Sequence, residues 1–243
     1  ADGQNRMALG MAQPMQNLRL IAQVSANMAQ LALTLGNIDE GWVLAEQARE
    51  VGQQCSYQRV IAQAHRVQGD AYRLLTANDE AIDQYRKAVE MGGNTPAGLD
   101  ALYRLGLALV QTDRGAEGMQ AIERCIEVSR TNGMGLQLLH ALSARALAMT
   151  HQGQFDEALA LAEEVSVQAA QRSLPYLRAM AFVPWGHKAQ VEGRLDEARQ
   201  RALALVEFAR KTSNPLMEIS ALISVFETGG QQNAQRLRLR DLI

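Results

Sequence analysis

One short motif recurs five times along the chain at a nearly constant spacing, and this repeat constrains the fold more than any other feature. Each copy ends in a glutamate followed by a small residue, and the small residues are 40, 37, 40 and 40 positions apart: Gly41, Ala81, Gly118, Ala158 and Ala198. Another small residue precedes each of these by twelve positions: Ala29, Gly69, Gly106, Ala146 and Gly186. Small side chains allow two helices to pack closely where they cross. Each repeat is therefore predicted to be one pair of antiparallel helices.

The residues around the motif are typical of a turn between two helices. Gly36, Gly153 and Gly193 precede it in three copies, where glycine can end a helix in a left-handed conformation. The acidic residues follow at the start of the second helix, where carboxylates interact favourably with the positive end of the helix dipole. This helix-start role explains the repeated Asp-Glu pairs without any acid–base catalysis. Prolines at 96, 175 and 215 mark the starts of first helices, since the first turn tolerates a missing N–H.

These patterns predict an all-α fold, a right-handed α-solenoid of antiparallel helix pairs with about five full repeats and partial ones at its ends. We expect one superhelical domain over residues 1–243, and we expect it to be a fragment of a longer array because both ends interrupt the pattern. Its expected parts are the end of a preceding helix at 1–13, repeats at 17–53, 58–91, 96–131, 136–171 and 176–211, and a partial or capping repeat at 215–243.

Charge and composition exclude several classes of protein. The 24 Lys and Arg residues nearly balance the 26 Asp and Glu residues, so no strong field favours nucleic acid. No apolar run reaches the roughly 18 residues of a membrane-spanning helix. The two cysteines form no disulfide framework and fit a reducing compartment, so a cytoplasmic location is expected. Cys125 lies at a core position of its helix, whereas Cys55 lies near a helix end.

The sequence contains no recognisable catalytic or cofactor motif. It has no phosphate-binding Gly-x-x-x-x-Gly-Lys loop, no Gly-x-Ser-x-Gly elbow and no His-Glu-x-x-His pair. Its four histidines, His65, His140, His151 and His187, are never three or four residues apart, so no single helix offers two metal ligands. We therefore predict no enzyme activity, no cofactor and no metal site.

The repeat resembles the tetratricopeptide repeat, most closely where Gly69 and Tyr72 are followed by Asp79-Glu80-Ala81 and then by Tyr85 and Ala88. The spacing departs from that family, since it is near 40 residues rather than about 34. The proline that closes the family's repeat and the first large aromatic residue of that repeat are also missing here. Arrays with longer helices are similar to the helical tails of bacterial signal-transduction ATPases, including maltose-activator-type transcriptional regulators. This resemblance implies a sensor, an oligomerisation surface or a clamp on the ATPase.

In such solenoids the first helices line the concave face, which is the usual binding surface. The register then predicts partner-binding residues in this groove: Arg66, Arg73, Tyr103, Arg104, His140, His151 and His187. The three arginines with Tyr103 would suit an acidic peptide or a carboxylate, because the guanidinium group binds carboxylates through two parallel bonds. The alternative is a solvated face on which Asp70 and Asp100 neutralise the arginines.

Pro184 is a second unusual feature, because it is predicted to lie deep inside the helix 176–191 and to kink it. The kink would either open a small pocket beside Trp185 and His187 or only adjust the curvature of the array.

The leading functional hypothesis is a module that binds a protein, a peptide or another domain of its own parent chain, as the regulatory or sensor tail of a larger bacterial signalling or transcription protein. The alternative is a free-standing scaffold or self-associating adaptor that forms homo-oligomers through its open ends. The third and least favoured hypothesis is an enzyme. No direct contact with nucleic acid or membrane is expected.

Overall fold

A computed structural model describes residues 17–174, 176–177 and 182–228 of the chain, and within these ranges every regular element is an α-helix. The predicted end of a helix at 1–13, residues 229–243 of the predicted partial repeat and Pro175 lie outside the described residues. The chain divides into two compact units, Ala1–Ala141 and Leu142–Ile243, which are described separately.

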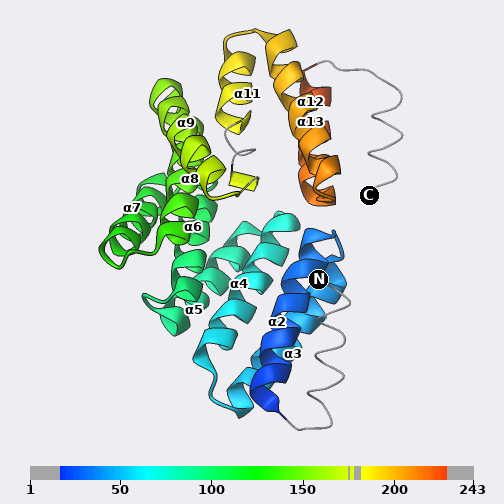
Figure 1. The fold of residues 1–243 in the computed structure, drawn as a ribbon, viewed down its shortest axis with the longest axis vertical. Helices are drawn as coiled ribbons and strands as arrows, with labels where there is room; N and C mark the ends of the chain where they lie inside the picture. Colours follow the sequence, from blue (N-terminus) through cyan, green and yellow to red (C-terminus); the bar gives the residue numbers. More distant parts are fainter. Residues whose placement is uncertain (1–16, 175, 178–181, 229–243) are drawn as a thin grey trace. The chain divides into compact units, whose positions relative to one another are not determined.

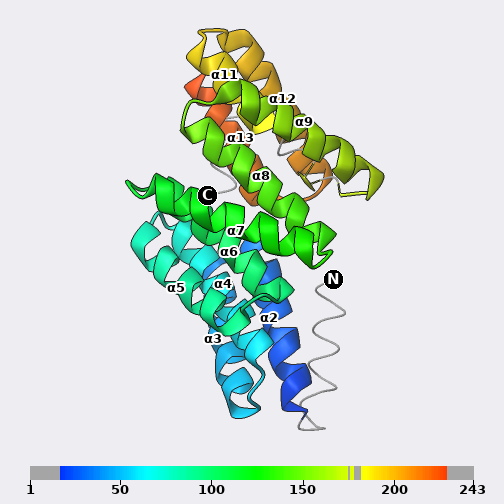
Figure 2. The same ribbon diagram turned by 90° about the vertical axis from the view of Figure 1, so that its left-hand side faces the viewer.

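Unit 1 contains three complete helix pairs and the start of a fourth first helix. The first helices of the pairs are α2 (Leu18–Thr34), α4 (Gln58–Leu74) and α6 (Pro96–Val110), and the second helices are α3 (Ile38–Gln54), α5 (Asn78–Gly92) and α7 (Gly115–Thr131). Each helix packs against the next one along the chain, and α4 also packs against α2 and α6, as Figures 1 and 2 show. Helix α8 (Gly135–His151) begins in this unit.

Unit 2 contains the rest of α8 and four further described helices. These are α9 (Phe155–Gln171), α11 (Phe182–Val191), α12 (Leu195–Lys211) and α13 (Pro215–Glu227). Helix α12 packs against both α11 and α13, and α11 also contacts α9. The described helices lie within a few residues of the ranges predicted from the repeat, and the predicted fold class, an all-α solenoid, is confirmed.

The predicted turn chemistry is also confirmed. Gly36, Gly153 and Gly193 have φ of 86°, 77° and 75°, so each ends its helix in the left-handed region. The Asp-Glu pairs lie in the first turns of α3, α5, α9 and α12. Four further positive-φ positions in turns carry hydroxyl side chains rather than glycine: Ser56, Thr76, Ser173 and Ser213. Sequence reasoning missed these because only glycine signals a left-handed residue strongly.

Small residues do bring the helices close in unit 1. A Cβ atom added at Gly106 of α6 would lie 2.8 Å from the backbone oxygen of Gly118 in α7, and one added at Gly118 would lie 2.5 Å from the oxygen of Gly106. Gly69 faces the ring of Tyr85 in the same way, with the nearest ring carbon 2.6 Å from an added Cβ. The prediction fails at Gly186, since nothing lies within 4 Å of a Cβ there.

The core between the helices consists mostly of alanine and short aliphatic side chains. One cluster joins α2, α3 and the start of α4 through Ala22, Ala26, Ala48, Val60 and Ala64. Cys125 is fully buried, as predicted, and burial raises the pKa of its thiol to about 11. Cys55 is the C-cap residue of α3 and is partly exposed.

Pro184 lies in α11, whose described part begins at Phe182, and residues 178–181 before it lie outside the described residues. The predicted kink of the helix 176–191 at Pro184 therefore stays a prediction. Pro184 is buried and lies in the same part of the core as Leu147 and Val165.

Candidate partner-binding surface

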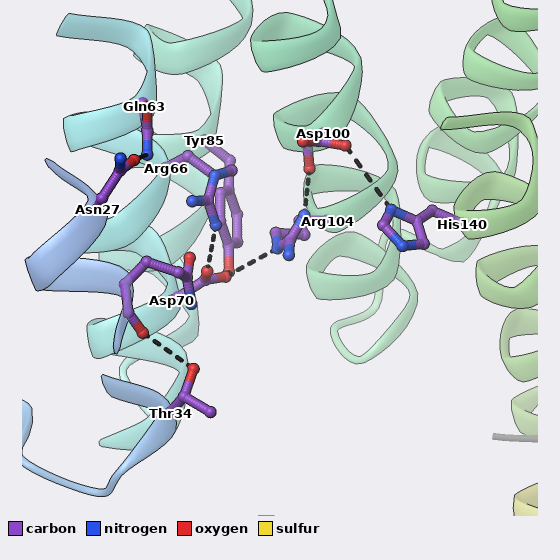
Figure 3. A network of polar contacts seen from close by, with 10 residues as sticks. Asn27, Thr34, Gln63, Arg66, Asp70, Tyr85, Asp100, Arg104 and His140 are labelled. Carbon is purple, nitrogen blue, oxygen red and sulfur yellow. Dashed lines mark hydrogen bonds and ion pairs between the residues drawn. The ribbon is translucent and has the colours of Figure 1, made fainter. Parts of the chain in front are cut away.

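The first helices of unit 1 present a continuous band of polar side chains, which we call the polar face. Four of its members occupy the same place in successive repeats, six residues before the small residue of the first helix: Gln23, Gln63, Asp100 and His140. The remaining members lie one or two turns further along the same helices: Asn27, Arg66, Asp70, Tyr103 and Arg104. Figure 3 shows most of these residues at close range.

Amide side chains connect α2 to α4 at one end of the polar face. The Nε2 group of Gln23 donates to Oδ1 of Asn27 and to Oε1 of Gln63, at 3.1 Å each. The Nε2 group of Gln63 donates to the same oxygen of Asn27 at 3.2 Å. Arg59 donates through Nη2 to Oε1 of Gln23 at 2.6 Å. Since Asn27 is exposed and Gln23 and Gln63 are half-buried, the network lies at the protein surface.

A buried ionic network centred on Asp70 connects α4, α5 and α6. Arg66 donates through Nη1 to Oδ2 of Asp70 at 2.8 Å, and the Arg104 Nε atom lies 3.1 Å from Oδ1. The hydroxyl of Tyr85 donates to Oδ1 at 2.7 Å. Arg66 and Asp70 are only 7% and 6% exposed, and Tyr85 is fully buried (Figure 3). Each charge compensates the other, so removing either partner would leave an uncompensated buried charge.

The charges in this network shift the pKa of two of its groups. Burial alone would raise the pKa of Asp70, but the positive charges of Arg104, Arg66 and Arg73 outweigh it and hold the pKa below its ordinary value. Burial, together with the negative charge of Asp70, raises the pKa of Tyr85 well above its ordinary value. Asp70 therefore stays ionised, and Tyr85 stays protonated and able to donate.

Arg104 connects this network to a second acidic group. Its Nη1 group donates to the backbone oxygen of Asp100 at 2.8 Å, and its guanidinium lies 4.6 Å from the centroid of the Tyr103 ring. His140, at the start of α8, lies with Nδ1 3.8 Å from Oδ1 of Asp100, which is within ion-pair range but too long for a hydrogen bond. The rings of Tyr103 and His140 are 5.5 Å apart. Burial would raise the pKa of Asp100, but His140 and the charge of Arg104 lower it.

The residues predicted to bind a partner thus fall into three groups. Arg66, Tyr103, Arg104 and His140 come together on the polar face, and the Arg104 side chain is 25% exposed. Arg73 is exposed at the end of α4. His151 and His187 come together in unit 2, where both are exposed and their ring centroids are 6.3 Å apart. Whether any of them binds a partner stays a prediction.

Sequence reasoning did not foresee that Arg66 is buried, and it missed Tyr85 as a member of the network. Tyr85 comes from α5, where its ring lies against Gly69 and its hydroxyl donates to Asp70. The available signal was the spacing of Arg66 and Asp70, because residues four apart on a helix are neighbours.

Other kinds of site find no support in the described part of the chain. Within it, no three His, Cys, Asp or Glu side chains are grouped so that they could hold a metal ion. None of the described helices combines the length and the apolar character needed to cross a bilayer.

An all-α array of antiparallel helix pairs that carries polar side chains along its first helices belongs to the helical-repeat class of proteins. Within this array, residues 99–132 match the model of the tetratricopeptide repeat family. The match covers most of α6 and all of α7, the two helices that cross closely at Gly106 and Gly118. None of the curated proteins matches the chain.

Solved structures share the fold at low sequence identity. Aspartyl phosphate phosphatase F from Bacillus subtilis matches with a TM-score of 0.57 and 14% identity over 87% of this chain, which spans 60% of the phosphatase. PilW, a type IV pilus biogenesis factor, matches with a TM-score of 0.55 and 16% identity over 90% of this chain and 98% of PilW. A tetratricopeptide repeat protein from Parabacteroides merdae matches with a TM-score of 0.51 and 12% identity over 98% of this chain and 90% of its own. At these identities the likeness shows the fold alone.

Proposed function

We propose that this protein is a non-enzymatic module that binds a protein or peptide, and that the polar face of unit 1 is its binding surface. The observation that carries the proposal is the side-chain network of Gln23, Asn27 and Gln63, which joins neighbouring repeats at the surface. Amide side chains both donate and accept, so they match the alternating N–H and C=O groups of an extended backbone. The network also holds them in place before binding, which lowers the entropy lost on association.

Arg104 supplies a second anchor on the same face, and the buried Tyr103 lies against it. The Arg104 guanidinium lies over the Tyr103 ring, and part of the Arg104 side chain stays exposed. Arginine and tyrosine are among the residues that contribute most to binding energy at interfaces. A partner that contacts both the amides and Arg104 would span α2, α4 and α6.

The same proposal places the module in a larger bacterial signalling or transcription-regulating protein of the cytoplasm, as its regulatory or sensor tail. The support is the resemblance of the long repeats to the helical tails of signal-transduction ATPases. The partner would then be a peptide, another protein or another domain of the parent chain.

The test is partner capture with matched variants. The purified chain serves as bait in a lysate of its source organism, and bound proteins are identified by mass spectrometry. Asn27→Ala with Gln63→Ala should abolish recovery of a specific partner, because both amides lie on the polar face. The control, Gln53→Ala with Gln54→Ala, removes two exposed amides from the end of α3 and should retain the partner.

Two outcomes would contradict the proposal. Equal recovery by both double variants, with unchanged circular dichroism, would mean that the partner binds elsewhere. Recovery of copies of this chain alone, together with a dimer in light scattering, would support the self-associating adaptor instead.

A further inference from the structure

Two arginines flank one tyrosine at the edge of the polar face. Arg19 and Arg59 are the second residues of α2 and α4, and both lie ten residues before the small residue of their helix. The guanidinium carbon of each lies 5.8 Å from the centroid of the Tyr57 ring. Tyr57 is the N-cap residue of α4, and its ring packs against the alanine-rich core cluster between α2, α3 and α4. The two cations are thus gathered around a fixed aromatic ring.

Neither arginine has a carboxylate partner among the described residues. Other arginines of unit 1 are compensated: Arg66 and Arg104 pair with Asp70, and Arg86 and Arg114 pair with Glu117. Within the described part of the chain, Arg124 and Arg130 of α7 also have no carboxylate partner, but neither lies over an aromatic ring, so the cluster is distinguished by its two cations around Tyr57. Arg19 and Arg59 are both exposed. Two uncompensated positive charges close to one ring favour binding of a negatively charged group.

The amide network holds Arg59 in position. Gln23 donates through its nitrogen to Asn27 and Gln63, so its oxygen points to Arg59 and accepts the 2.6 Å bond from Nη2. This bond uses one of the five N–H donors of the guanidinium, and the others stay available. A positioned guanidinium loses less conformational freedom when it binds a carboxylate than a free one does.

We propose that the Arg19–Tyr57–Arg59 cluster binds a carboxylate group of the partner, so that the module selects acidic peptide segments. This inference rests on the proposed function and adds the chemistry of the ligand to it. Guanidinium–carboxylate pairs form two parallel charge-assisted bonds, and the tyrosine ring shields them from water on one side. From this cluster, the bound segment would continue along Gln23, Asn27 and Gln63.

The test measures peptide binding by fluorescence anisotropy. The probes are fluorescein-labelled hexaglutamate with an amidated C-terminus, amidated hexaglutamine, and hexaglutamine with a free C-terminus. We expect the amidated hexaglutamate to bind and the amidated hexaglutamine not to bind. Binding of the hexaglutamine that has a free terminus would also support the proposal and would identify a terminal carboxylate as the ligand.

The decisive comparison uses two variants that remove the same charge. Arg19→Gln with Arg59→Gln should weaken binding of the acidic probe by about tenfold or more, since it removes charge-assisted bonds. The control, Arg124→Gln with Arg130→Gln, removes two exposed arginines from α7 and should change the affinity by less than about twofold. Equal weakening in both variants, or in neither, would overturn the assignment of the site.

Partner capture with the Arg19→Gln and Arg59→Gln variant separates the two proposals. A partner that this variant retains, but that the Asn27→Ala and Gln63→Ala variant loses, would overturn the carboxylate site and leave the polar face as the binding surface. Loss of the partner with both variants would support both the carboxylate site and the polar face as the binding surface.

Discussion

Asp70 is the residue on which the buried polar network of unit 1 depends. Its carboxylate accepts from Tyr85 and compensates both Arg66 and Arg104. Asp70→Asn preserves the shape but leaves the 7% exposed Arg66 without a counter-charge. Removing one partner of a buried ion pair costs about 3 kcal/mol or more. We expect urea unfolding of Asp70→Asn to show this loss of stability. The control Asp113→Asn, at the exposed α6–α7 turn, should leave the stability unchanged. Equal urea midpoints for Asp70→Asn and Asp113→Asn would mean that water reaches Arg66 readily.

The same network predicts a specific response to acid. The pKa values of Asp70 and Asp100 are lower in the folded state than their ordinary value of 3.8, so the unfolded chain binds more protons as the pH falls. Their contribution to stability is complete above the ordinary pKa and is lost as the pH falls through the folded values. The stability deficit of Asp70→Asn should therefore be constant from about pH 7 to 5 and shrink below about pH 4. Urea midpoints across this range measure it, and a deficit that persists at low pH would show that the loss does not come from the Asp70 charge.

At the scale of helices, two glycines at the same repeat position should respond to substitution in opposite directions. Gly106→Ala places a Cβ 2.8 Å from the Gly118 oxygen, so overpacking should destabilise the protein by about 1–3 kcal/mol. Gly186→Ala meets nothing within 4 Å, so the better helix propensity of alanine should stabilise the protein by about 0.5–1 kcal/mol. Thermal melts followed by circular dichroism compare the two variants. A lower melting temperature for both would mean that α11 packs as closely as α6.

The difference between these glycines shows which features sequence could predict. Helix pairs and their turns depend on local signals, such as the glycine at 36 and the acidic residues at 39 and 40, and these were correct. The packing around Gly186 depends on helices distant in sequence, and the close crossing predicted there was wrong. The same limit applies to the candidate site. The repeat register predicted which side chains share a face, but it could not predict that Asp70, the partner of Arg66, also binds a tyrosine from the next helix.

At the scale of the whole molecule, contacts between elements close in sequence dominate the described fold, so stability should be distributed along the chain rather than shared by one core. Packing joins each helix of unit 1 to its near neighbours, and a separate core cluster joins α12 and α13 through Val206, Leu222 and Val225. In such arrays stability is approximately the sum of repeat and nearest-neighbour contributions. A local defect should therefore have local consequences.

Hydrogen exchange measured by mass spectrometry can test this with two matched cavities. Ile122 of α7 and Leu222 of α13 are both fully buried, and truncation of either to alanine should cost about 2–5 kcal/mol. Ile122→Ala should reduce amide protection in α6 and α7 while α12 and α13 stay unchanged, because the two regions belong to different compact units. Leu222→Ala should give the reverse pattern. Loss of protection in both regions with either variant would show that the chain unfolds as one cooperative unit, and the local argument would then fail.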